Sequence, residues 1–173
     1  VVISGTYTPN GFGSVATRNS GGISFYYFKG NAIRVEAMRD MVNDRNLIPQ
    51  ELRDAGLEQA INDVLAWNPN AFNSPTASFS VGGLNFYYEG VCYYTVLIRH
   101  FSNNMVPVLM GYGRYGVVRN NVYQLSINKI IGPGQPVINP PGTDPDDEDT
   151  SWISADVNIM RWYIRNQNVE ELL

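Results

Sequence analysis

The feature that most constrains the fold is the stretch from Gly111 to Pro136, which opens with glycines and aromatic residues and then alternates apolar with polar residues. The apolar set is Tyr123, Leu125, Ile127 and Ile131, and the polar set is Gln124, Ser126 and Asn128. A period of two with one apolar face predicts a half-buried antiparallel strand. Gly132, Pro133, Gly134 and Pro136 predict its end, because glycine frees the backbone and proline lacks a donor. We therefore expect Leu125 and Ile127 to be buried, and Ile127→Ala to cost about 2–5 kcal/mol.

The remaining pattern predicts strands at both ends of the chain and helices between them. Strands are expected over residues 1–7, 23–29, 79–81, 85–88, 92–98 and 152–164, and a short strand or an apolar loop over 105–110. Residues 79–81 and 85–88 are expected to be the arms of a hairpin around Gly82-Gly83. Pro49 followed by Gln50 and Glu51 predicts the start of a helix, because proline is tolerated in the first turn and an acidic residue suits the N-terminal dipole. The apolar face of this helix is Leu57, Ile61, Val64 and Leu65. Residues 32–43 are a weaker helical candidate. Strands, then helices, then strands predict a mainly β protein, an antiparallel β-sandwich with a helical insertion around residues 32–67.

The closing segment carries a change of parity. Ile153, Ala155, Val157 and Ile159 are apolar at odd positions, whereas Met160, Trp162 and Ile164 are apolar at even ones. Such a switch predicts a bulge near Ile159, or a strand that leaves one sheet for another. The segment before it, residues 139–150, is acidic and rich in proline, which predicts a mobile surface loop. Deleting residues 142–149 is expected to leave stability nearly unchanged.

Composition bounds the class of protein. With 173 residues, 44% of them hydrophobic, the chain can form one domain with a proper core. A net charge of -4 without a basic run argues against nucleic acid as a partner. The single cysteine permits no internal disulfide, and no apolar run approaches the roughly 20 residues of a membrane span. Because the chain begins Val1-Val2-Ile3 without Met, we expect a fragment of a longer precursor.

Residues with catalytic or metal-binding chemistry are few. His100 is the single histidine, so a histidine-based triad or a multi-histidine metal site is excluded. Cys92 lies within an apolar alternation, which predicts an inert buried thiol. The acidic residues between 144 and 149 lack the spacing of an EF-hand, and a solvated loop explains them better than calcium does. No enzyme activity, cofactor or metal is therefore expected.

Aromatic residues offer one further surface. Tyr26, Tyr87 and Tyr93 belong to a larger group of strand aromatics that could stack a sugar. Strands also carry aromatic residues simply for packing. Both interpretations stay open on the sequence, with packing favoured.

Three blocks of the sequence carry a family resemblance. They are RYGVVRNNVYQLSIN over residues 114–128 with the following GPG, YEGVCYY over residues 88–94, and the segment from Val157 to Glu171. Together they resemble the C-terminal domain of Bacteroidales fimbrillins, the subunits of type V pili. The resemblance implies a transthyretin-like β-sandwich over residues 1–173, closed by the segment 151–173, as the C-terminal domain of a longer precursor.

The resemblance also implies a function. Such subunits polymerise by strand exchange into cell-surface fimbriae on the outer membrane of Gram-negative bacteria, from a precursor that is lipid-anchored before assembly. Val157, Ile159, Trp162 and Ile164 are then the expected anchors of the exchanged strand, with other fimbrial subunits as partners and adhesion to a host surface ligand as the outcome. The alternatives are an accessory or tip adhesin that binds carbohydrate or host protein, and, on the residues alone, an ordinary last strand of the sandwich.

Overall fold

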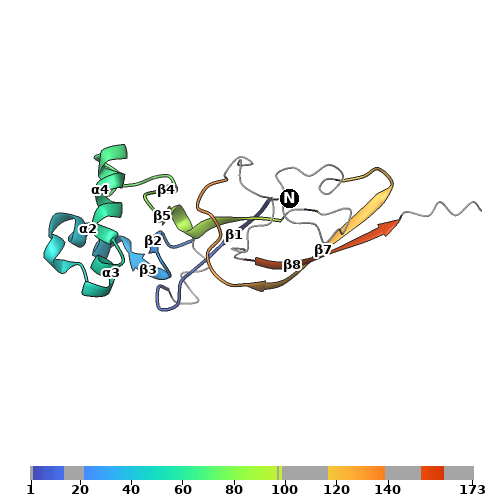
Figure 1. The fold of residues 1–173 in the computed structure, drawn as a ribbon, viewed down its shortest axis with the longest axis horizontal. Helices are drawn as coiled ribbons and strands as arrows, with labels where there is room; N and C mark the ends of the chain where they lie inside the picture. The colour runs from blue at the N-terminus through green and yellow to red at the C-terminus, as the bar shows by residue number, and fades with distance from the viewer. Residues whose placement is uncertain (1, 14–21, 97, 99–116, 139–152, 162–173) are drawn as a thin grey trace, which may run out of the picture. The chain divides into compact units, whose positions relative to one another are not determined.

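The computed structural model describes residues 2–13, 22–96, 98, 117–138 and 153–161, and it divides the chain into two compact units (Figure 1). The helix-bearing unit consists of Val2–Thr95 with Gly132–Gly142, and the ribbon unit consists of Val96–Ile131 with Thr143–Leu173. The helix-bearing unit contains β1 (Val2–Thr6), β2 (Phe25–Phe28), β3 (Asn31–Arg34), α2 (Val35–Asn43), η1 (Arg45–Leu47), α3 (Gln50–Asp54), α4 (Leu57–Trp67), β4 (Phe79–Val81), β5 (Leu84–Tyr87), η2 (Tyr88–Gly90) and β6 (Val91–Thr95). The ribbon unit contains β7 (Asn121–Ile130) and β8 (Ile153–Arg161). Strands outnumber helices among the described residues, and each described strand pair is antiparallel, so a mainly β architecture with a few helices is confirmed.

A four-stranded sheet in the order β3-β2-β5-β4 forms the centre of the helix-bearing unit. Two of its turns have a local cause. Lys29 and Gly30 have φ of 43° and 90°, and Gly82 and Gly83 have φ of 58° and 78°. Positive φ at both central residues is the geometry of two-residue hairpins that match the twist of the strands. The hairpin predicted around the glycine pair is confirmed.

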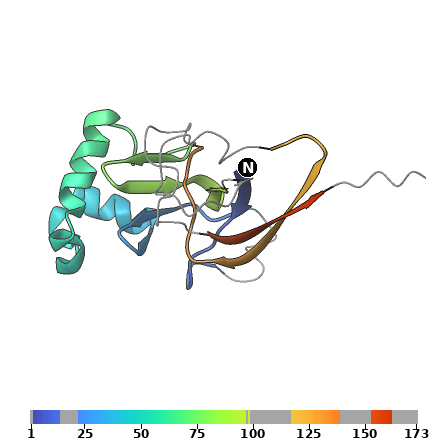
Figure 2. The ribbon, with the colours of Figure 1, turned by 45° about the vertical axis from the view of Figure 1, so that its right-hand side comes forward.

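The described α-helices, α2, α3 and α4, lie together against one face of this sheet (Figure 2). That face carries Tyr26, Phe28, Ile33, Phe79, Leu84 and Phe86, which join the buried residues of the helices in one apolar core. The alternate residues of β2 lie on the other face of the sheet, where the Phe25 ring stacks on the Tyr87 ring with centroids 4.7 Å apart. The aromatic residues of β2 are therefore needed on both sides of the sheet.

The helical region begins later than the sequence pattern predicted, and it is interrupted once. Residues 31–34 form β3, because their pairing with β2 outweighs a weak helical preference. The helix predicted after Pro49 starts at Gln50 but stops at Asp54, and α4 resumes at Leu57. Gly56 lies between them with φ of 92°, a left-handed conformation that an α-helix cannot contain.

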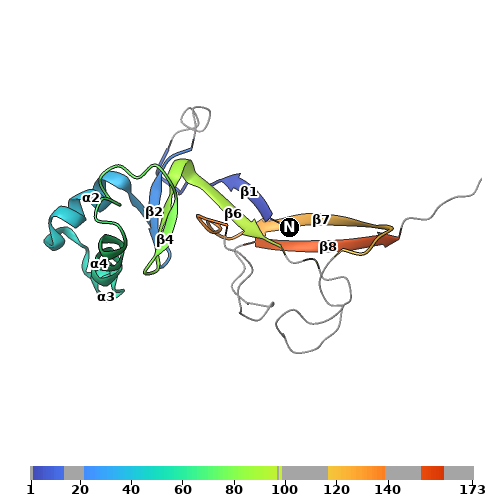
Figure 3. The same cartoon turned by 90° about the horizontal axis from the view of Figure 1, so that it is seen from above.

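The remaining strands form two separate two-stranded sheets, β1-β6 and β7-β8 (Figure 3). The strand predicted over residues 92–98 ends at Thr95, and it pairs with β1 rather than lying at the centre of a larger sheet. On its other side, Tyr93 exchanges two backbone hydrogen bonds with Gln135, of 2.8 and 2.7 Å. The segment Gly132–Pro136 therefore does more than end a strand, since it covers part of the second edge of β6.

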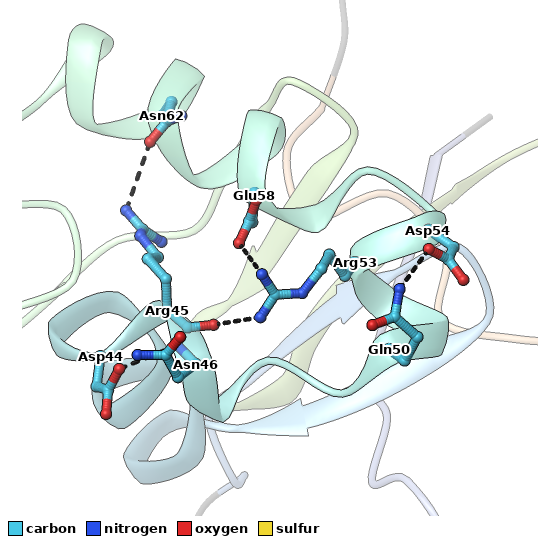
Figure 4. A network of polar contacts seen from close by, with 8 residues as sticks. All are labelled: Asp44, Arg45, Asn46, Gln50, Arg53, Asp54, Glu58 and Asn62. Carbon is cyan, nitrogen blue, oxygen red and sulfur yellow. Dashed lines mark hydrogen bonds and ion pairs between the residues drawn. The ribbon is translucent and has the colours of Figure 1, made fainter.

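Polar contacts fix the helices to one another (Figure 4). Arg53 donates to Glu58 at 2.9 Å and to the carbonyl oxygen of Arg45 at 2.8 Å, which joins α3 to α4 and η1. Both side chains of the ion pair are more than a third exposed, so its net contribution to stability is small. The apolar core, and not this network, stabilises the helical layer.

Ile127 is not buried as the alternation predicted. Leu125 and Tyr123 are half-buried, and Gln124 and Ser126 are exposed as expected, but 47% of Ile127 is exposed. A two-residue period fixes which face a side chain is on, whereas burial needs another element against that face.

We therefore expect Ile127→Ala to lower the free energy of unfolding by about 1 kcal/mol or less, well below the loss expected for a core position. Urea unfolding of the two proteins, followed by circular dichroism, measures the difference. A loss above 2 kcal/mol would mean that the residue is covered in solution.

Candidate functional site

The β7–β8 ribbon aligns apolar residues of one strand with apolar residues of the other. Directly opposite pairs are Tyr123 and Ile159, Leu125 and Val157, Ile127 and Ala155, and Ile130 and Ile153. The intervening pairs are mostly polar, such as Gln124 with Asn158 and Ser126 with Asp156. Since residues directly opposite each other share a face, this register gives the ribbon one apolar face along its whole length.

A bulge in β7 keeps the apolar face of the ribbon continuous. Ile127 is opposite Ala155, but Lys129 is opposite the very next residue of β8, Ser154. β7 therefore carries one extra residue across this step, which changes the parity of everything that follows. Ile130, rather than the predicted Ile131, becomes the next apolar residue of the face.

The bulge predicted near Ile159 is absent. The register runs without a shift from Leu125 and Val157 to Asn121 and Arg161, so the irregularity lies in β7 and not at the change of parity in β8. The alternative interpretation, a strand that changes sheets after Ile159, concerns residues beyond Arg161.

Several strands present an edge in the part of the chain that the structure describes, and β8 and β1 are two of them. β8 pairs with β7 alone, and β1 pairs with β6 alone. A strand edge that lacks a neighbour offers a row of backbone donors and acceptors to another strand. Of the four expected anchor residues, Val157 and Ile159 lie within β8, opposite Leu125 and Tyr123, while Trp162 and Ile164 lie outside the described residues.

Two of the three residues considered for an aromatic ligand surface are buried, so packing, the favoured interpretation, is confirmed for Tyr26 and Tyr87. Tyr26 and Tyr87 are each only 1% exposed, because the helices cover one face of β2 and β5 and Phe25 covers Tyr87 on the other. Tyr93 is half-buried and lines an open hollow of about 390 Å³. Its aromatic companion there is Tyr88, which the sequence placed at the end of the strand expected over residues 85–88 and which begins the short helix η2.

Buried phenols instead hold the segment Gly132–Gly134. Tyr87 donates a hydrogen bond of 2.6 Å to the carbonyl oxygen of Gly134, and Tyr94 donates one of 2.9 Å to that of Gly132. The Cys92 thiol lies 3.5 Å from the Tyr94 oxygen and is fully buried, which confirms the prediction of a buried cysteine. We call these three side chains with Gly132–Gly134 the tyrosine clamp.

Burial raises the pKa of the Tyr87 and Tyr94 phenols above the ordinary value, and the neighbouring Cys92 raises it further. Burial likewise raises the pKa of Tyr26, whose hydroxyl has no hydrogen-bond partner among the described residues. A raised pKa means that the folded state keeps the proton to a higher pH than the unfolded state does. The stability gained from these neutral phenols is present below the ordinary pKa of about 10 and is lost as the pH rises above it.

The melting temperature is therefore expected to hold steady up to about pH 9 and to fall steeply above pH 10. Thermal melts at increasing pH, with phenolate formation followed by ultraviolet absorbance, test this expectation. Phenolate absorbance that rises in full before any loss of fold would contradict it, because the buried phenols would then ionise in the folded state.

Other functional classes receive no support from the described residues. Among them no group of three or more histidine, cysteine, aspartate or glutamate side chains is placed to hold a metal ion. No described helix has the length and apolar character to cross a membrane. His100 and the acidic stretch of residues 144–149 lie outside the described residues, as do residues 105–110.

Comparison with known proteins identifies the part of the chain that contains both the ribbon and the tyrosine clamp. A family profile described as "Major fimbrial subunit protein type IV, Fimbrillin, C-terminal" matches residues 85–168, just under half of the chain. A search of curated proteins finds no match. The matched segment begins in β5 and includes β6, β7 and β8. Residues 85–168 are therefore similar to the C-terminal domain of fimbrillins, a family of structural subunits of cell-surface fimbriae.

Proposed function

We propose that the chain assembles with other fimbrial subunits by strand exchange, with the segment 151–173 as the exchanged strand. The observation that carries this proposal is the register of β8, which places Val157 and Ile159 opposite apolar residues of β7. In recognition by strand addition, backbone hydrogen bonds give affinity and alternate side chains give specificity. The anchors are Val157, Ile159, Trp162 and Ile164.

The exposed apolar residues of the two-stranded ribbon support this role. A two-stranded hairpin is marginally stable by itself in water, and stable sheets have more strands or a covering layer. Ile127 and Ile130 are nevertheless 47% and 50% exposed on the apolar face of the ribbon. An exposed apolar face beside an edge strand favours association with further strands. A subunit that polymerises uses this tendency, whereas a monomeric protein would conceal it.

The wider architecture is part of the same proposal. Residues 1–173 are proposed to be the C-terminal domain of a longer, lipid-anchored precursor from a Gram-negative outer membrane. In the assembled fimbria the strands complete a transthyretin-like sandwich, with the acidic residues 139–150 as the connection to the exchanged segment. Adhesion to host surfaces is the proposed use of the fimbria.

The decisive experiment alters the anchors without removing the strand. We expect the full-length double variant Val157→Lys and Ile159→Lys to remain folded and to lose polymer, because each lysine would have to be buried without a partner. The matched control is Asn158→Lys, whose neighbour across the ribbon is the exposed Gln124, and it should polymerise normally. Electron microscopy and sedimentation measure polymer, and circular dichroism measures folding.

Truncation after Thr150 separates the remaining interpretations. A folded monomer without polymer supports strand exchange. An unfolded monomer would identify the segment as an ordinary core strand, and normal polymer from either the truncated or the lysine variant would refute the proposal.

A further inference from the structure

The hollow beside Tyr93 is formed by three pieces of the helix-bearing unit. Its lining residues are Ser78, Tyr88, Val91, Tyr93, Pro136, Val137 and Ile138. Its volume of about 390 Å³ lies within the range typical of small-molecule sites. Ser78 precedes β4, Tyr88 to Tyr93 span η2 and β6, and the remaining wall follows the tyrosine clamp.

Hydrogen bonds from both backbone and side chains hold these pieces in place. The paired hydrogen bonds between Tyr93 and Gln135 join one side of the hollow to the other. The Ser78 hydroxyl oxygen accepts a hydrogen bond of 2.9 Å from the backbone N–H of Tyr88. The buried bond from Tyr87 to Gly134 anchors the start of the third wall. A hollow fixed in this way loses little conformational entropy when a ligand binds.

The chemistry of the lining selects a class of ligand. None of the seven residues is charged, so neither an anion nor a cation has a partner there. Tyr88 and Tyr93 each present an aromatic ring and a phenol hydroxyl, and neither hydroxyl is engaged with another described residue. The other walls are aliphatic. A neutral molecule with apolar C–H faces and a rim of hydroxyl groups complements this combination.

We propose that the hollow is a binding site for a neutral pyranose sugar, which stacks on the Tyr93 ring and exchanges hydrogen bonds with the Tyr88 and Ser78 hydroxyls. Hydroxyl side chains both donate and accept, as sugar hydroxyls do, so they match without a fixed charge. The site is open, and it uses none of the proposed anchors of polymerisation. It can therefore be tested separately from strand exchange.

The test is a titration of the intact chain with methyl β-D-glucopyranoside, methyl β-D-galactopyranoside and methyl N-acetyl-β-D-glucosaminide, followed by ¹H–¹⁵N NMR and saturation transfer. We expect at least one glycoside to bind with a Kd in the millimolar range, about -4 kcal/mol, and to shift resonances of the hollow. N-acetylneuraminic acid, which is charged, should bind more weakly. Absence of shifts in the hollow for all three glycosides would overturn the proposal.

Variants locate the site. Tyr93→Ala should weaken binding at least about tenfold, whereas Tyr93→Phe, which keeps the ring, should weaken it less. The control is Trp67→Ala, which removes another exposed aromatic residue of the same unit, 57% exposed and outside the hollow, and should leave binding unchanged. Amide spectra report whether each variant is folded. Equal binding by Tyr93→Ala, or binding of a hexaproline peptide in the hollow without binding of any glycoside, would refute the sugar site.

Discussion

Gly134→Ala is expected to lower the free energy of unfolding by about 3 kcal/mol or more, the upper range for inserting a group into a closely packed site. A β-carbon at this position would lie 2.2 Å from the carbonyl oxygen of Tyr93 and 2.9 Å from the ring of Tyr94. The first of these atoms belongs to the backbone and cannot move aside as a flexible side chain could. The substitution would therefore displace the clamped segment from β6 and break the Tyr87 hydrogen bond.

Gly5→Ala is the matched control, because a β-carbon there would meet no atom within 4 Å. It lies in β1, on the opposite side of β6, and we expect a change within about 0.5 kcal/mol. Denaturant titration of both variants measures the difference. Equal stability of the two variants would mean that the clamped segment does not pack against β6 in solution.

Phe86→Ala is expected to destabilise the helix-bearing unit by about 3–5 kcal/mol. Phe86 is 1% exposed, with its ring 4.7 Å from that of Tyr26 and 5.5 Å from that of Phe79. Alanine would remove the transfer energy of the ring and leave a cavity among rigid aromatic neighbours, which cannot collapse to fill it. The effect should exceed that of Ile127→Ala several-fold.

Phe86→Leu provides the graded comparison, because it keeps most of the apolar volume and should cost clearly less than alanine. The melting temperature and the urea midpoint of the three proteins measure this order. A small effect of the alanine variant would contradict the placement of the core between the helices and the sheet.

Local chemistry accounts for the part of the fold that the sequence predicts well. The Gly82-Gly83 turn, the start of α3 after Pro49 and the apolar face of α4 each depend on residues that are close together in the chain. Short-range patterns report such features because both the cause and the effect lie within a few residues.

The misplaced features depend on distant partners. The hydrogen bond from Tyr87 to Gly134 joins residues 47 apart, so Gly132–Gly134 could be recognised only as the end of a strand. β3 forms because β2 lies beside it. Ile127 is exposed because burial needs a second element against its face, which the alternation of the sequence does not report. For the candidate site, the pattern identified the strand that contains Val157 and Ile159, but only the shape of the hollow selects Tyr88 and Tyr93 from the larger group of strand aromatics.

The bulge in β7 has a consequence for how the ribbon can be aligned. In a regular two-stranded ladder, sliding one strand by two residues returns every apolar residue to its own face, so the alternation alone leaves several alignments nearly equal. In this ribbon the extra residue between Ile127 and Lys129 belongs to β7 and moves with that strand, so a slide toward Val157 would keep Ile127 and Ile130 on one face and give them other apolar partners in β8. The bulge therefore fixes which residues of β7 share the apolar face, while the offset of the two strands depends on the individual pairs.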